Sequence, residues 1–192
     1  MNRQVIVEDV GRLLDEFREK AEPLGVAVLR AASDVDAAHA VVAWAQSLEV
    51  DSVIVASEVT RQAPGIETVL TSAGLHVRRP ASPAETRDAP LGLSMGRLAI
   101  AETGSVLLSE PTLEDRSVGM LTLAHATICP TAVLVASLDE AAPVIRELAR
   151  TSGGAFSTLV TGPSRTADIE RVLTVGVQGP DKVMTLFVDH MS

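Results

Sequence analysis

The feature that most constrains the fold of this chain is segment 52–56, Ser-Val-Ile-Val-Ala, in which four apolar residues follow one another, three of them β-branched. A strand with one face in water alternates apolar and polar residues, whereas an uninterrupted run is typical of a strand buried on both faces. Similar short runs alternate with segments whose apolar residues recur at helical spacing, as at Val10, Leu13 and Phe17. We therefore predict an α/β fold, a mostly parallel sheet with helices on both faces.

These patterns give an expected order of elements along the chain. Helices are expected over residues 5–21, 35–49, 64–72, 117–124, 138–149 and 166–173. Strands are expected over residues 25–29, 52–56, 75–78, 97–100, 105–108, 131–136, 156–160 and 183–188. Residues 80–90 contain several prolines and are predicted to form a long Pro-rich loop. The length of 192 residues suits one domain, so we expect a single domain over residues 1–192.

The balance of charges excludes several classes of partner. Sixteen Lys and Arg residues stand against 25 Asp and Glu residues, which gives a net charge of −9. Nucleic acids and anionic membrane surfaces attract proteins of the opposite sign, so we expect neither nucleic-acid binding nor membrane insertion. The single cysteine, Cys129, can form no internal disulfide and can hold no iron–sulfur cluster. Together with an N-terminus that lacks an apolar signal segment, these features predict a cytoplasmic protein without an intrinsic cofactor.

Several common catalytic sequences are missing from the chain. The four histidines are not spaced as metal ligands, so no metal site is expected. The sequence contains no Gly-x-Ser-x-Gly motif, no Walker A motif and no dinucleotide-binding glycine pattern. In open α/β sheets, ligands bind beyond the carboxyl ends of the strands. This rule directs attention to the turns at 56–60, 101–105 and 161–166.

The first candidate turn is Glu102-Thr103-Gly104-Ser105, which lies between two apolar runs. A carboxylate that is partly removed from water at a sheet end can act as an acid, a base or a nucleophile, so Glu102 is a candidate catalytic residue. Thr103, Gly104 and Ser105 are candidate ligand contacts. The alternative is an ordinary polar turn, in which Gly104 supplies a positive φ angle and Glu102 is solvated.

The second candidate turn begins at Gly162, directly before a predicted helix start. The first turn of a helix presents free N–H groups to an anion, so Gly162, Ser164 and Thr166 are candidate ligand contacts. Arg165 is a candidate bidentate partner for a carboxylate or a phosphate. Gly179, in a later Gly-Pro turn, is a further candidate contact. Plain helix capping and a connecting turn are the alternatives.

Two segments in the second half of the chain resemble the lactate-utilisation protein C family, the LUD domains. Segment 99–108 is similar to the family's IA-(D/E)-TG-(S/T) motif, and segments 162–170 and 175–180 are similar to its closing signature. The resemblance implies a single LUD-type α/β domain, related in fold to CoA-transferases, ribose-phosphate isomerases and formyltetrahydrofolate cyclo-ligases. Gln178 stands where many members have histidine, which puts a histidine role at that position in doubt.

The resemblance also implies a role in lactate utilisation, the oxidation of L-lactate to pyruvate, beside separately encoded iron–sulfur subunits. We expect a subunit or accessory factor that binds a small anionic ligand at the strand ends, with Glu102 facing the Ser164 turn. One alternative is a self-sufficient enzyme that transfers an acyl or phosphate-activated group with Glu102 as nucleophile. Another alternative is a non-catalytic assembly module.

Overall fold

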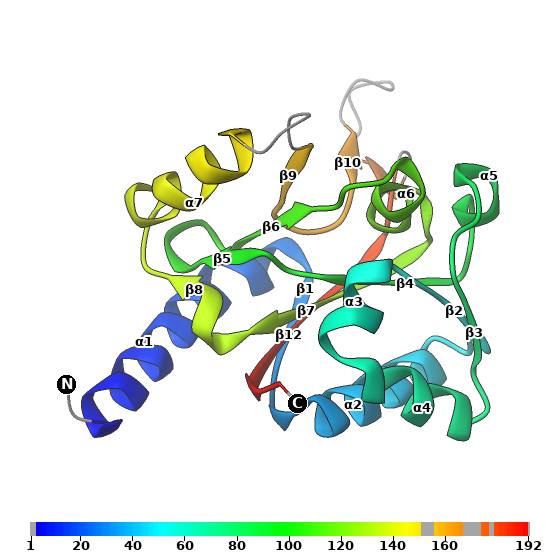
Figure 1. The fold of residues 1–192 in the computed structure, drawn as a ribbon, viewed down its shortest axis with the longest axis horizontal. Helices are drawn as coiled ribbons and strands as arrows, with labels where there is room; N and C mark the ends of the chain where they lie inside the picture. Colours follow the sequence, from blue (N-terminus) through cyan, green and yellow to red (C-terminus); the bar gives the residue numbers. More distant parts are fainter. Residues whose placement is uncertain (1–2, 151–155, 167–173, 177–178, 192) are drawn as a thin grey trace.

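A sheet of six parallel strands forms the centre of the molecule (Figure 1). The computed structural model describes residues 3–150, 156–166, 174–176 and 179–191. The strands of this main sheet lie in the order β1-β12-β7-β4-β2-β3. They are β1 (Val26–Ser33), β2 (Ser52–Val55), β3 (His76–Arg78), β4 (Leu91–Met95), β7 (Ala124–Pro130) and β12 (Lys182–His190). The predicted α/β class with a mostly parallel sheet is confirmed.

Helices connect most of these strands. They are α1 (Arg3–Ala21), α2 (Asp34–Ser47), α3 (Ser57–Gln62), α4 (Pro64–Ser72), α5 (Pro83–Thr86), α6 (Leu113–Leu121) and α7 (Leu138–Arg150), with short 3-10 turns η1 (Glu22–Leu24), η2 (Ala101–Thr103) and η3 (Thr131–Val133). Ser33 caps α2 as its sequence position predicts, because its Oγ accepts a hydrogen bond from the Asp36 N–H at 3.2 Å. None of the described helices is both long and apolar enough to cross a membrane.

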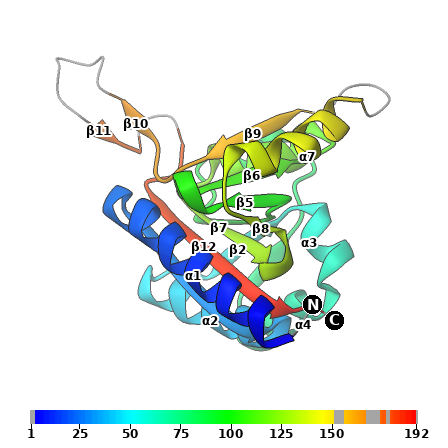
Figure 2. The ribbon, with the colours of Figure 1, turned by 90° about the vertical axis from the view of Figure 1, so that its left-hand side faces the viewer.

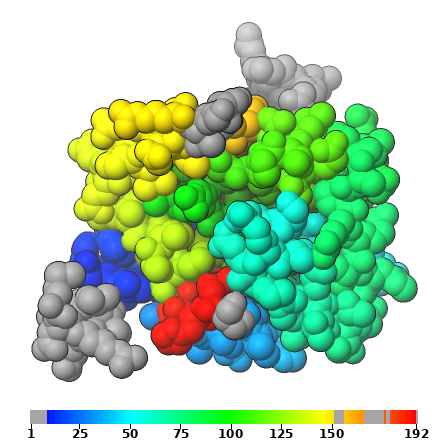
Figure 3. Space-filling model, viewed as in Figure 1, coloured from blue at the N-terminus to red at the C-terminus, as the bar shows by residue number. Residues whose placement is uncertain are grey.

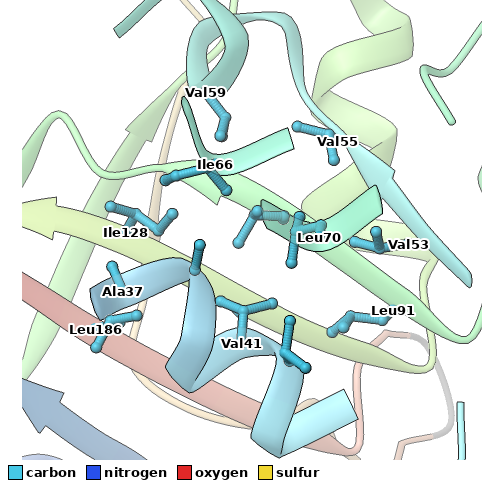
Figure 4. Close-up of a cluster of buried hydrophobic side chains, with 14 of the residues drawn as sticks. Ala37, Val41, Val53, Val55, Val59, Ile66, Leu70, Leu91, Ile128 and Leu186 are labelled. Carbon is cyan, nitrogen blue, oxygen red and sulfur yellow. The ribbon is translucent and has the colours of Figure 1, made fainter. Parts of the chain in front are cut away.

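Helices α2 and α4 cover one face of the main sheet (Figure 4). Successive side chains of a strand point to opposite faces, and Met184, Leu186 and Val188 of β12 all point into this core. From the helix side, Ala37 and Val41 of α2 are completely buried against the strands. The small alanine side chain lets α2 lie close to the sheet.

The other face of the main sheet is covered by α1 and by a second sheet (Figure 2). Val183 and Phe187, the β12 side chains that point away from α2, belong to this second core together with Phe17 of α1. The rings of Phe17 and Phe187 meet edge to face with their centroids 5.0 Å apart. The second sheet has the order β8-β5-β6-β9, formed by β5 (Leu98–Ile100), β6 (Ser105–Ser109), β8 (Leu134–Val135) and β9 (Ser157–Val160). Helix α7 packs on its outer side.

One stretch of the expected element order is wrong. The sequence predicts a helix over 117–124 and a strand over 131–136, but α6 begins at Leu113 and the central strand β7 occupies the residues before 131. Thr112 sets the start of α6, because its Oγ1 accepts a hydrogen bond from the Asp115 N–H at 3.1 Å. The apolar run of β7 contains a buried histidine and ends in a proline, which hides it from a pattern search.

The expected loop over 80–90 contains the helical turn α5, and the strand β4 that follows it escapes the pattern altogether. Every residue of β4 is buried, but Gly92 and Ser94 interrupt its apolar run and none of its residues is β-branched. Gly92 is there because α6 crosses the strand: a Cβ at this position would lie 2.8 Å from the Val118 carbonyl oxygen. The packing of α6 therefore requires glycine at position 92, and this glycine weakens the apolar pattern by which β4 would be predicted as a strand.

The connections of β2 and β4 leave the main sheet in opposite directions. After β2 the chain continues through α3 and α4 to β3 at the edge, whereas after β4 it returns toward β7 on the other side. Because β2 and β4 are neighbours, their connections separate at their carboxyl ends. Such a topological switch point is where open α/β sheets bind ligands.

Candidate functional site

A cavity of about 370 Å³ lies at the switch point. Helix α3 follows β2 and the segment from Gly96 follows β4, so the cavity lies between the carboxyl ends of these strands. We call it the β2–β4 crevice; its lining residues are Glu58, Arg61, Gln62, Met95, Gly96, Arg97, Ser109, Pro111 and Leu148. Figure 3 shows this side of the molecule, with the cyan surface of α3 next to the green segments that follow β4. The expected turn at 56–60 therefore contributes to a cavity.

Two guanidinium groups give the crevice its positive charge. Arg61 forms an ion pair with Glu58, which also accepts a hydrogen bond from Gln62. Arg97 is exposed, and its guanidinium forms no hydrogen bond or ion pair with other residues in the described part of the chain. Guanidinium groups bind carboxylates and phosphates through charge-assisted, often bidentate, hydrogen bonds. The lining therefore suits one end of a small anion.

The backbone that carries Arg97 is fixed by close packing. A Cβ at Gly96 would lie 2.3 Å from the Cys129 Sγ, so no larger residue fits without displacing β7. The Gly96 N–H donates to the Ile128 carbonyl at 2.7 Å, and the Arg97 N–H donates to the Leu107 carbonyl at 2.8 Å. Burial raises the pKa of the Cys129 thiol far above its usual range, so this cysteine is an inert core residue.

Asp115, at the start of α6, ties that helix to α3. Its Oδ1 accepts a hydrogen bond from the Ser57 N–H at 2.8 Å, and its Oδ2 accepts one from the Ser57 hydroxyl at 2.5 Å. Thr112 donates to the same Oδ2 at 3.0 Å. Although Asp115 is buried, its carboxylate is well supplied with donors. It therefore positions α3 at the edge of the crevice.

Glu110 lines a small cavity of about 20 Å³ next to the crevice and is the most strongly perturbed carboxyl group described. Its pKa is raised from 4.5 to about 7, chiefly by burial; the charges of Asp115 and Glu58 contribute to the rise, while the Ser94 hydroxyl and Arg116 oppose it. Its Oε1 has no hydrogen-bond partner among the described residues. Its chain neighbours, residues 109 and 111, line the crevice. Glu110 thus changes its protonation near neutral pH beside a cavity, a property common at functional sites.

Glu102 lies elsewhere and has a structural role. The turn between β5 and β6 forms as predicted, and Gly104 has the predicted positive φ of 62°. The Glu102 side chain is exposed, and its Oε2 accepts a hydrogen bond at 3.0 Å from the N–H of Leu138, the first residue of α7. The expected orientation toward the Ser164 turn is therefore not observed. Glu102 instead supplies a negative charge to the first turn of α7.

The rest of the first motif packs against α1 or reaches the second motif. A Cβ at Gly104 would lie 2.8 Å from the Ala21 backbone nitrogen, so the turn needs glycine for space as well as for conformation. Thr103 Oγ1 is buried without a hydrogen-bond partner in the described structure. Ser105 is buried, and its hydroxyl lies 2.7 Å from the Thr161 hydroxyl. Among the described residues, Ser105 is thus the member of this turn that forms a side-chain hydrogen bond with the segment leading into the second motif, whereas the whole turn was expected to face it.

The second motif does not begin a helix where one is expected. Arg165 and Thr166 form β10 (Arg165–Thr166), which pairs with β11 (Thr174–Val175) in an antiparallel ribbon. The remainder of the expected helix, 167–173, and Gln178 lie outside the described residues. The Arg165 guanidinium donates to the Leu24 carbonyl at 2.5 Å. It is therefore engaged with the backbone at the end of η1.

Three of the predicted contact residues do line a common cavity. Gly162, Ser164 and Gly179 border a space of about 240 Å³. The Ser164 N–H donates to the Pro180 carbonyl at 2.8 Å, which brings the two Gly-Pro turns together. This cavity lies at the amino ends of β7 and β12, whereas the rule for open sheets directed attention to carboxyl ends. The ligand-contact roles of these residues stay predictions.

The residues of the β2–β4 crevice are absent from the sequence-based candidates. Arg61 and Arg97 are isolated arginines without a motif, and Glu110 precedes a proline after an apolar run. The available signal was positional: a carboxylate directly after a buried strand, and a turn after segment 52–56. Unless the order of the strands in the sheet is known, neither of these two signals distinguishes a segment that lines a crevice from an ordinary loop.

Comparisons with known proteins agree with the resemblance and the fold. The sequence model of the LUD domain family matches residues 14–188. Lactate utilization protein C of Shouchella clausii is 38% identical over 104 residues, 53% of this chain and 44% of that relative. The protein of that name from Bacillus subtilis is 32% identical over 106 residues, 54% of this chain and 44% of the relative.

The fold itself recurs in a solved structure. A DUF162 family protein from Deinococcus radiodurans superposes with a TM-score of 0.70 at 21% identity, covering 93% of this chain and 98% of that one. The matched stretch is less than half of the curated relatives' length. The family match nevertheless spans nearly all of both cores, the crevice and β12 as far as Val188. This chain belongs to the LUD domain family.

Proposed function

We propose that this chain acts in lactate utilisation as a subunit or accessory factor that binds a small carboxylate in the β2–β4 crevice. Family membership and the names of its relatives support the process. The observation that carries the ligand class is the pair of guanidinium groups, Arg61 and Arg97, at a 370 Å³ cavity on the switch point. Arg97 is the principal anchor, because Arg61 already forms an ion pair with Glu58.

Glu110 makes this binding depend on pH. Below about pH 7 its carboxyl is protonated, so no additional negative charge lies next to the crevice. Above that pH the carboxylate repels an anionic ligand. We expect the affinity for lactate to fall as pH rises through about 7. Glu110→Gln should remove this dependence.

The electron-transfer step is assigned to other chains. A single cysteine does not supply the ligands of an iron–sulfur cluster, so we propose that separate iron–sulfur subunits oxidise the lactate. In this account the present chain binds and orients the carboxylate. The guanidinium of Arg97 would hold the carboxylate end and leave the 2-hydroxyl or 2-keto group toward the rest of the crevice.

Calorimetric titration with lactate and pyruvate tests the proposal. We expect Arg97→Ala to weaken binding at least tenfold, because charge-assisted hydrogen bonds contribute about 1.5–3 kcal/mol. Arg78→Ala is the matched control, because Arg78 is an exposed arginine at the end of β3 that does not line the crevice. Loss of binding in Arg165→Ala with none in Arg97→Ala would refute the crevice and support the Ser164 turn.

The lactate titration, together with an assay of acyl-donor turnover, separates the alternatives for Glu102. A group-transfer enzyme with Glu102 as nucleophile requires the carboxylate, so Glu102→Gln would abolish turnover of an acyl donor. We expect no turnover by the wild-type chain and unchanged lactate binding in this variant, because Glu102 serves α7. An assembly module predicts that complexes carrying Arg97→Ala oxidise lactate normally, whereas our account predicts a loss.

A further inference from the structure

The cavity between the two Gly-Pro turns is separate from the crevice. Its lining residues are Gly119, Met120, His125, Leu159, Val160, Thr161, Gly162, Ser164, Gly179, Pro180 and Val183, none of which lines the crevice. We call it the His125 pocket. His125 is the second residue of β7, so the pocket opens at the amino ends of the main strands, away from the switch point. A ligand there is independent of the carboxylate proposed above.

His125 is the unusual residue of this pocket. It is completely buried, and neither Nδ1 nor Nε2 has a hydrogen-bond partner among the described residues. Burial lowers its pKa from 6.5 to about 4, so the imidazole is neutral at physiological pH. A neutral imidazole carries one donor and one acceptor. Two unpaired polar atoms in a core carry an energetic penalty that a suitable ligand would relieve.

Glycine lets α6 lie close to the buried imidazole at the wall of the pocket. A Cβ at Gly119 would lie 3.4 Å from the His125 Cε1 and 3.5 Å from its Nε2. At Gly179, where φ is 156°, a Cβ would lie 3.3 Å from the Ser164 Cβ. Any longer side chain at either position would fill the space between α6, His125 and the Ser164 turn.

The remaining walls determine the charge of a ligand. Apart from the neutral imidazole, the lining is apolar or bears hydroxyl groups, with Met120, Leu159 and Val160 forming apolar walls and Ser164 and Thr161 supplying hydroxyls. No Lys, Arg, Asp or Glu is among the lining residues. An anion would enter without a compensating cation in a protein of net charge −9, and a cation would enter without a carboxylate.

We propose that the His125 pocket binds a small uncharged molecule of the amide or lactam class, whose adjacent C=O and N–H groups pair with one imidazole nitrogen and with the Ser164 hydroxyl. Its volume of about 240 Å³ limits the ligand to metabolite size. The apolar walls favour a flat or aliphatic body attached to the polar edge. His125 is the recognition residue.

Methyl NMR on the full chain tests this inference, with nicotinamide and 2-pyridone as probes and nicotinate as the anionic control. Met95 lines the crevice and not this pocket, whereas Met120 lines this pocket and two neighbouring cavities, so binding here is read from the Met120 methyl signal together with the His125 ring nitrogens. We expect saturable shifts of Met120 and of the His125 ring nitrogens with at least one uncharged probe, no shift of Met95, and no effect of nicotinate. Equal shifts with nicotinate, or none with either uncharged probe, would overturn the proposal.

Variants distinguish recognition by the imidazole from simple filling of space. His125→Phe should weaken probe binding at least tenfold, whereas His76→Gln, at an exposed histidine of β3, should not change it. If His125→Phe does not fold, Gly119→Ala serves the same purpose, because alanine is favoured in a helix and adds a methyl group beside the ring. Gly11→Ala is its control, since that α1 position faces open space. Unchanged probe affinity in Gly119→Ala, or in a folded His125→Phe, would contradict the proposal.

Discussion

Glu110 and His125 are two buried ionisable residues whose pKa values are shifted in opposite directions. Burial raises the pKa of Glu110 to about 7 and lowers that of His125 to about 4. Both shifts favour the uncharged form, which is the general effect of a low-dielectric surrounding. Each residue also lines a cavity, Glu110 a water-sized one of about 20 Å³ beneath α6. Burial of each group therefore makes the stability of the fold depend on pH.

The contribution of Glu110 to the free energy of unfolding should be lost as the pH rises. Its folded-state pKa lies above its unfolded value of 4.5, so the contribution is fully present below pH 4.5 and disappears as pH rises through about 7. The loss is about 3 kcal/mol at most. In urea unfolding, Glu110→Gln should therefore gain stability relative to wild type between pH 4.5 and 8. A difference that is constant over this range would contradict the assignment.

His125 should produce the opposite trend. Its folded-state pKa lies below the unfolded value of 6.5, so its contribution is fully present above pH 6.5 and is lost as pH falls through about 4. Between pH 4.5 and 6.5 the two effects oppose each other. Titrating the imidazole by NMR measures the shift directly, with exposed His39 and His190 as internal references.

Gly104 offers a test of the interpretation that its turn is structural. Gly104→Ala adds a Cβ 2.8 Å from the Ala21 backbone nitrogen at a φ of 62°. We expect a loss of about 2 kcal/mol or more in the free energy of unfolding. Gly11→Ala should instead stabilise the chain by up to about 1 kcal/mol, because that helical position is open. Chemical denaturation measures the free energy of unfolding of both variants. Equal changes in the two variants would refute the structural interpretation of the Gly104 turn.

At the scale of secondary-structure elements, α6 connects the parts that form the crevice. It packs across β4 at Gly92, and its buried Asp115 holds α3 through Ser57. Helix α3 in turn carries three residues that line the crevice, Glu58, Arg61 and Gln62. The position of the guanidinium of Arg61 therefore depends on a helix far from it in sequence.

Replacing Asp115 should affect both stability and the neighbouring carboxyl group. Asp115→Asn removes the charge that accepts hydrogen bonds from Ser57 and Thr112, so we expect a loss of about 2–3 kcal/mol in unfolding experiments. The pKa of Glu110 should fall, because the Asp115 charge contributes to raising it. Glu114→Gln, in the same turn of α6, is the control and should change neither quantity appreciably. A pKa of Glu110 that stays at about 7 would contradict the coupling.

The elements that could be predicted are those whose packing follows one repeating pattern. Segment 52–56 is predicted as a buried strand and forms β2, since its apolar run is uninterrupted and Val53 to Val55 are all buried. Gly92 interrupts the apolar pattern of β4 because α6 packs closely against this position. His125 interrupts the apolar pattern of β7 at a position that lines a cavity. Local sequence cannot reveal such reasons, because the contacting residues come from other segments.

At the scale of the whole molecule, the order of the strands determines where a ligand fits. The carboxyl-end rule was available from the sequence, but the choice among turns needed the neighbour relation of β2 and β4. The Glu102 turn lies in the second sheet and packs between α1 and α7. Arg97 and Glu110 become candidates only when the sheet order brings the ends of separate strands together.

The whole-molecule account places carboxylate binding at the carboxyl ends of β2 and β4. Methionine methyl NMR during a titration with lactate tests this placement directly, because Met95 lines the crevice and Met120 lines the His125 pocket. The account predicts a saturable shift of the Met95 signal that disappears in Arg97→Ala, with Met120 unchanged. A shift of Met120 instead, or a Met95 shift that persists in Arg97→Ala, would contradict it.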